Sequence, residues 1–212
     1  LWYADSAITK EKFVPKVLEY LEKIRPQTIQ QHWRTEEIER IADIQGKSFA
    51  ELDELAVKAD SFDKRIAIDN LIIAMNPQNI FKARYQRAVD LDGALLYDEA
   101  IEEYQRALAC ATDADEKSDM FIVCMFNLLR LLDIVRKFFL AWEVAKRCLA
   151  IAKTIEDKFI AINTMLRMSY NEGNIELVEQ ALGYYDDLKT DYGIDIIRDY
   201  KKWLKEQKQN KK

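Results

Sequence analysis

The sequence predicts an all-α protein, and three observations carry this prediction. Apolar residues recur at helical spacing along almost the whole chain, and no stretch alternates apolar and polar residues for long enough to predict a strand. The 212 residues include only 5 Gly and 3 Pro, too few for the many tight turns of a β-sandwich or barrel. With 49% hydrophobic and 33% charged residues, the chain is apolar enough to bury a core and is not disordered.

The N-terminal segment, residues 1–76, is predicted to be helical. Its first helix has an apolar stripe at helical spacing, formed by Phe13, Val17, Leu18, Leu21 and Ile24. Thr35 is a predicted N-cap of the next helix, and Gly46 ends that helix. Ser48 and Glu51 form a capping box that starts another helix. A further helix from Phe62 to Met75 is expected to end at Asn76-Pro77.

Residues 77–193 are predicted to form helical hairpins, because their helices are joined by short connections. A capping helix with a lysine-rich end is expected over 194–212, where Ile197, Tyr200 and Leu204 form one inward stripe. The helices predicted in these two regions span 78–93, 97–112, 116–136, 138–153, 157–172, 175–189 and 194–208.

The second helix of each predicted hairpin repeats one frame of aromatic and small residues. Tyr97, Ala100, Tyr104 and Ala107 follow each other at steps of three, four and three residues. The anchor Ala100 has equivalents 41 and then 37 residues further on, at Ala141 and Val178. Self-similarity at such periods is typical of proteins built from stacked supersecondary units.

This frame resembles the tetratricopeptide repeat, most closely between Tyr97 and Leu108, and Gly173 matches the glycine between the two helices of that repeat. The resemblance implies a right-handed superhelix of stacked antiparallel hairpins, a tetratricopeptide-like α-solenoid, of which residues 1–76 could be degenerate repeats. The chain departs from the family pattern because the first helices lack its tryptophan and Gly93 lies four residues before Tyr97 instead of two.

The residues predict no enzyme, cofactor or metal site. His32 is the one histidine, and the three cysteines have neither zinc-ligand nor thioredoxin-like spacing. The acidic run Asp113–Asp119 lacks the glycine and glutamate of a calcium loop and is better explained by helix capping. Glu102 and Glu103 are expected on a solvated face. The aromatic residues expected in the core are Phe138, Phe139, Trp142, Tyr184, Tyr185 and Trp203.

Polar residues within the apolar first helices are the candidate binding residues. If Leu129 and Leu166 are equivalent, Arg130 and Arg167 are equivalent too, 37 residues apart. In the tetratricopeptide family this position lines the concave groove, so the resemblance makes the two arginines candidates to bind a carboxylate or backbone carbonyls of a peptide. The alternative is that both arginines pair with neighbouring carboxylates such as Asp133. The candidate set is Asn127, Arg130, Asp133, Asn163, Arg167 and Tyr170.

Two functions are compatible with these observations. The first is a protein–protein interaction module or scaffold that binds a peptide or protein segment in a concave groove. The second is a peptide-sensing domain of a bacterial signalling or transcription regulator, with the effector domain outside this chain. Partners are expected to be proteins or peptides, a homo-oligomer stays open, and the acidic body (net charge −5) argues against direct nucleic-acid binding. The odd cysteine count predicts a cytoplasmic location, and no segment is long and apolar enough to span a membrane.

Overall fold

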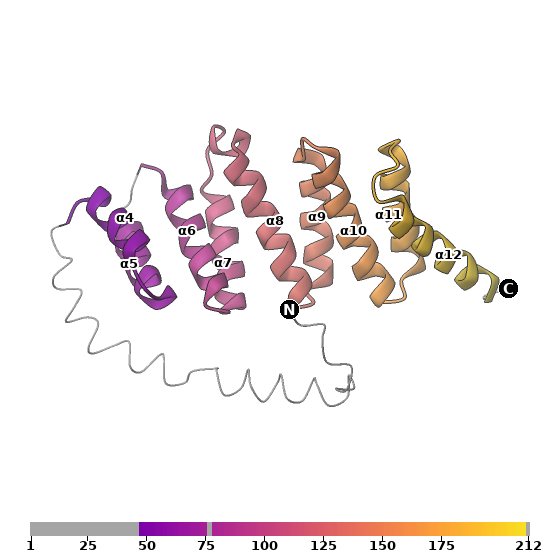
Figure 1. Cartoon of the computed structure of the whole chain (residues 1–212), viewed down its shortest axis with the longest axis horizontal. Helices are drawn as coiled ribbons and strands as arrows, with labels where there is room; N and C mark the ends of the chain where they lie inside the picture. The colour runs from indigo at the N-terminus through magenta and orange to yellow at the C-terminus, as the bar shows by residue number, and fades with distance from the viewer. Residues whose placement is uncertain (1–46, 76–77, 211–212) are drawn as a thin grey trace, which may run out of the picture. The chain divides into compact units, whose positions relative to one another are not determined.

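The computed structural model describes residues 47–75 and 78–210, and every regular element in these ranges is helical (Figure 1). The all-α class is therefore confirmed for this part of the chain. The helices predicted before Gly46, and His32, lie outside the described residues. The elements are α4 (Phe49–Lys58), α5 (Phe62–Ala74), α6 (Ile80–Gly93), α7 (Tyr97–Ala109), a 3-10 turn η2 (Asp115–Lys117), α8 (Asp119–Ile134), α9 (Phe138–Ile151), α10 (Ile155–Asn171), α11 (Ile175–Asp187) and α12 (Ile194–Asn210).

The helices predicted between residues 78 and 208 are all present, with ends within three residues of the prediction. The start of α8 differs by three residues, since the prediction began that helix at residue 116. The side chain of Ser118 accepts a hydrogen bond from the Phe121 backbone N–H at 3.2 Å and so caps the helix. Residues 115–117 form η2 instead, where Asp115 accepts hydrogen bonds from the backbone N–H and the hydroxyl of Thr112.

Three turns between helices share one geometry, at 94–96, 135–137 and 172–174. In each, the last turn residue donates its N–H to the carbonyl five residues back, as in Leu96 to Leu91, Lys137 to Leu132 and Asn174 to Ser169. The middle residues, Leu95, Arg136 and Gly173, all have positive φ. This combination is the Schellman motif, which ends a helix and satisfies its last carbonyls. The turn position that Gly173 occupies is therefore left-handed in all three turns, although Leu95 and Arg136 occupy it in the other two.

Helices pack mainly against their neighbours in sequence, and α8 also contacts α10. Residues Phe49–Lys212 form one compact unit, within which α5 packs on α6 across the 75–78 junction. Side chains connect the first helices of successive hairpins directly: α6 to α8, α8 to α10, and α10 to α12. Figure 1 shows consecutive helices running in opposite directions, as the short connections predict.

The small residues of the repeated frame lie in the core, which the larger apolar residues of the other helices complete. The three anchors, Ala100, Ala141 and Val178, are fully buried, as is the Tyr104 ring. Small side chains at these positions let neighbouring helices approach closely, and larger apolar residues fill the remaining space. Trp142 and Tyr185 are buried as predicted, but Phe139 is 84% exposed, so its assignment to the core is wrong. Its place in the first turn of α9 directs the ring to the surface.

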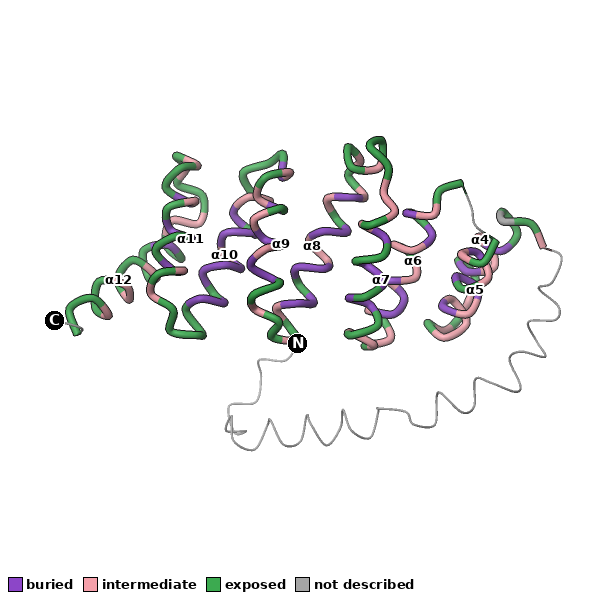
Figure 2. The backbone as a smooth tube through the Cα atoms, turned by 180° about the vertical axis from the view of Figure 1, so that it is seen from behind, coloured by how far each residue is buried: buried purple, intermediate pink, exposed green. Residues whose placement is uncertain are grey.

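The C-terminal helix α12 has the two faces that the sequence predicts. Ile197 is buried, Tyr200 and Leu204 are half-buried, and the lysines of the opposite face are exposed (Figure 2). The Trp203 ring lies 5.0 Å from the Tyr170 ring of α10, centroid to centroid. Within the described residues, no helix is long and apolar enough to cross a membrane.

Candidate functional site

Ion pairs join the first helices of successive hairpins. Arg130 of α8 pairs with Asp92 of α6, and Arg167 of α10 pairs with Asp133 of α8. Both aspartates are largely buried, whereas both arginines remain about half exposed. Each of these hydrogen bonds is donated by Nη2, one of the three nitrogens of the guanidinium. The structure therefore contains the pairing with neighbouring carboxylates that was the alternative to a binding role. Both arginines are still exposed enough to contact a ligand.

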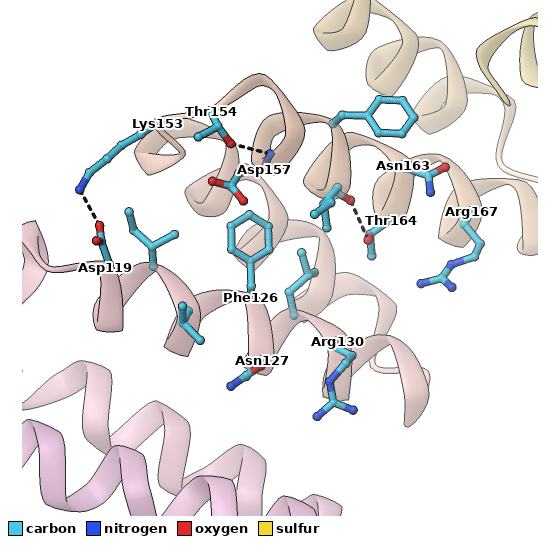
Figure 3. A pocket seen from close by; sticks show the side chains of 15 residues that line it. Asp119, Phe126, Asn127, Arg130, Lys153, Thr154, Asp157, Asn163, Thr164 and Arg167 are labelled. Carbon is cyan, nitrogen blue, oxygen red and sulfur yellow. Dashed lines mark hydrogen bonds and ion pairs between the residues drawn. The ribbon is translucent and has the colours of Figure 1, made fainter. Parts of the chain in front are cut away.

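A hollow of about 770 Å³ lies between α8 and α10 and is open to solvent (Figure 3). We call it the α8/α10 groove. Its walls come from both helices and from the short connection before α10. The lining residues are Asp119, Ile122, Val123, Phe126, Asn127, Leu129, Arg130, Lys153, Thr154, Asp157, Phe159, Ile160, Asn163, Thr164 and Arg167.

The α8/α10 groove has an apolar middle between two polar ends. Val123 and Ile160 are each about half exposed within it, at 46% and 50%. At one end Lys153 pairs with Asp119 at 2.9 Å, and Arg130 and Arg167 lie at the other end (Figure 3). Such an arrangement offers both apolar contact area and charged hydrogen-bond partners to a ligand.

Four of the six predicted site residues line this groove: Asn127, Arg130, Asn163 and Arg167. Asp133 lies outside the groove as the ion-pair partner of Arg167. Tyr170 also lies outside it, in an edge-to-face contact with the Tyr200 ring of α12.

The sequence interpretation missed the apolar residues of the groove. The stretch from Met120 to Leu129, uncharged and apolar except at Asn127, was a usable signal, because one helix cannot bury apolar residues around its whole circumference at a protein surface. Some of them must face outward, and Val123 does. A groove wall of exposed aliphatic side chains follows from that excess.

A buried cluster of charges was also missed. Glu103 is only 1% exposed, not solvated as predicted, and its carboxylate pairs with Arg84 at 2.7 Å and Arg87 at 2.9 Å. Arg106 adds a third contact at 3.3 Å. These guanidiniums offset the cost of burying the carboxylate between α6 and α7. The cluster connects the two helices, and none of its four residues lines the α8/α10 groove.

The described residues contain no group of three or more histidine, cysteine, aspartate or glutamate side chains arranged to hold a metal ion. All three cysteines are free thiols. Burial raises the pKa of the Cys124 and Cys148 thiols to about 12, so neither is a reactive thiolate at neutral pH.

No family model matches the sequence, and a comparison with curated proteins also finds no match. Among solved structures, the chain is similar to one described as "Crystal structure of BtubC (BKLC) from P. vanneervenii". The similarity has a TM-score of 0.47 and 19% identity, and it covers 86% of this chain and 75% of that chain. A similarity at this level does not establish a shared function.

Proposed function

We propose that this chain is a tetratricopeptide-like interaction module that binds a segment of another protein in the α8/α10 groove. The observation that carries the proposal is the open groove itself, with exposed aliphatic residues in its middle and two half-exposed arginines at one end. The proposal includes the finer fold assignment, a right-handed superhelix of stacked hairpins. It also includes a reducing, cytoplasmic location, which the three free thiols support.

The repeat assignment is supported by equivalences between the hairpins. The Schellman turns align Asp92 with Asp133, and Arg130 with Arg167. The two ion pairs therefore form the same contact at two successive hairpin junctions. A contact repeated in this way is expected when identical units stack with the same geometry.

The dimensions of the groove set the size of the bound segment. Asp119 and Arg130 mark its two ends on α8, and eleven helical steps of 1.5 Å separate them by about 16 Å. At about 3.3 Å per residue, an extended segment of roughly five residues would span this length. Apolar side chains of the segment would cover Val123 and Ile160. Its carbonyls or a carboxylate would accept hydrogen bonds from the two arginines.

Val123→Glu tests the proposal without disturbing either ion pair. It places a charge in the apolar middle of the groove, where a bound segment would have to bury it. Ile134→Glu is the matched control, because Ile134 lies on the same helix, is exposed to 47% compared with 46% for Val123, and does not line the groove. Both variants should have the helical circular dichroism of the parent chain.

The measurement is affinity capture with each variant as bait, followed by titration of the recovered partner. We expect Val123→Glu to weaken binding at least about tenfold, the effect of roughly 1.4 kcal/mol, and Ile134→Glu to leave it unchanged. Equal binding by the two variants would refute the groove assignment. Size-exclusion chromatography of the parent chain tests in parallel whether a second copy fills the groove.

A further inference from the structure

A second hollow, of about 480 Å³, lies between α9, the end of α10 and the start of α11. Phe138, Phe139 and Trp142 of α9 line one side of it, and Met168 and Glu172 of α10 line another. None of these residues lines the α8/α10 groove. We call this second site the aromatic hollow.

Phe139 is the most exposed large apolar residue of the described chain, with 84% of its surface accessible. Phe138, next to it, is partly exposed as well. Adjacent exposed aromatic rings at the mouth of a hollow are typical of an interaction site, since burying them elsewhere would stabilise the fold. Sequence-based reasoning placed Phe139 in the core, and departures of this kind concentrate at functional sites.

The charges of the aromatic hollow favour a cation. Its ionisable lining residues are Glu143, Lys146 and Glu172, and Glu143 already pairs with Lys146 at 2.7 Å. Glu172 is thus the uncompensated charge among them. It is also the C-cap residue of α10, where the negative end of the helix dipole disfavours a carboxylate. A bound cation would relieve this unfavourable placement and neutralise the hollow.

We propose that the aromatic hollow binds an arginine side chain of a partner protein. A guanidinium is planar and stacks on aromatic faces, as Phe138 and Phe139 offer, while its N–H groups donate to a carboxylate such as that of Glu172. Apolar atoms beside the arginine would cover Trp142 and Met168 at the base. This site is independent of the α8/α10 groove and gives the chain a second contact point with a different chemistry.

The test uses the full chain with 13C-labelled methionine methyl groups, because Met168 lines the hollow and reports its occupancy. The Met168→Leu variant assigns the signal. The probes are N-acetyl-arginyl-leucinamide and its citrulline analogue, which is neutral and has nearly the same shape. We expect the arginine probe to shift the Met168 signal and to bind at least about threefold more tightly than the citrulline probe, the effect of one partly exposed charge pair.

Two variants separate the contributions of the carboxylate and the aromatic rings. Glu172→Gln should lower the affinity for the arginine probe about threefold and leave the affinity for the citrulline probe unchanged, since only a charge pair is lost. Phe139→Ala should lower the affinity for both probes. Glu176→Gln, an exposed carboxylate on the first turn of α11 outside the hollow, is the control for the first variant. Both Glu172 and Phe139 are exposed, so these changes leave the core intact.

The proposal is overturned by any of three results. The two probes binding equally would show apolar recognition without a cation. An unchanged arginine affinity in Glu172→Gln would remove the carboxylate from the site. A Met168 signal that shifts on dilution without any probe would show that a second copy of the chain occupies the hollow. The Val123→Glu variant should bind the arginine probe normally, so failure of the α8/α10 groove would not affect this test.

Discussion

Asp69 of α5 is only 2% exposed, and its carboxyl group interacts electrostatically with that of Asp90 of α6. Burial first, and then the charge of Asp90, raise the pKa of Asp69 to about 8, although Arg87 and Arg65 act in the opposite direction. Asp69 is therefore mostly protonated at neutral pH. In the unfolded chain the same carboxyl has a pKa near 3.8 and is ionised. Folding must then take up a proton.

The sign of the pH dependence follows from this uptake. Because the folded pKa is the higher one, stability falls as pH rises from about 4 to about 8, and then levels off. One proton corresponds to about 1.36 kcal/mol per pH unit, so the loss between pH 4 and pH 7 is at most about 4 kcal/mol. Asp69→Asn keeps a hydrogen-bond donor toward Asp90 and does not titrate. We expect it to be more stable than the parent chain at pH 7.

Urea unfolding of the parent chain and of Asp69→Asn at pH 5, 6, 7 and 8 measures this effect. The stability difference should grow steadily over these values in favour of the variant, and Asp199→Asn, at an exposed position on α12, should show no such trend. A difference that stays constant with pH would refute proton uptake by Asp69 on folding. A variant that becomes relatively less stable toward pH 8 would show that Asp69 is ionised in the fold.

Three further predictions concern single positions. Gly193→Ala should lower the free energy of unfolding by more than about 2 kcal/mol, because φ is +72° and the new Cβ would lie 2.1 Å from Cζ of Phe159. Gly173→Ala should lower it by about 1 kcal/mol, because φ is +65° but no atom lies within 4 Å of the new Cβ. Equal urea midpoints for these two variants would contradict this. Tyr104→Phe removes a buried hydroxyl that has no hydrogen-bond partner in the described structure, so thermal unfolding should show unchanged or higher stability. Ellman's reagent at pH 8 should label Cys110 alone in the native chain and all three thiols in urea, since the other two are buried. Rapid native labelling of a second thiol would contradict the buried assignment.

The helices were predictable because their signals are local. Asn174 accepts a hydrogen bond from the Leu177 backbone N–H of the helix that it begins, and such a cap depends only on nearby residues. The small residues of the repeated frame also identify their own positions in the core. Phe139 escapes this reasoning, because its neighbours in sequence do not show whether another helix covers it.

The charged contacts were less predictable because they join residues far apart in sequence. Glu103 is buried because α6 brings Arg84 and Arg87 to it from 19 and 16 positions away. The equivalence of Arg130 and Arg167 could be inferred from the leucines beside them. That Arg130 contacts Asp92, 38 positions earlier, depends on how two hairpins are aligned, which helical periodicity does not encode.

The ion pairs between hairpins have a consequence for how the chain can grow. The hairpin of α8 and α9 contributes Arg130 to the junction before it and Asp133 to the junction after it. If this hairpin were duplicated in tandem, the new arginine would meet Asp133 of the first copy, and the new aspartate would meet Arg167. No buried carboxylate would lose its partner. At α12 the contact is made by the rings of Tyr170 and Trp203 instead of an ion pair, so such a duplication could not be repeated there with the same charges.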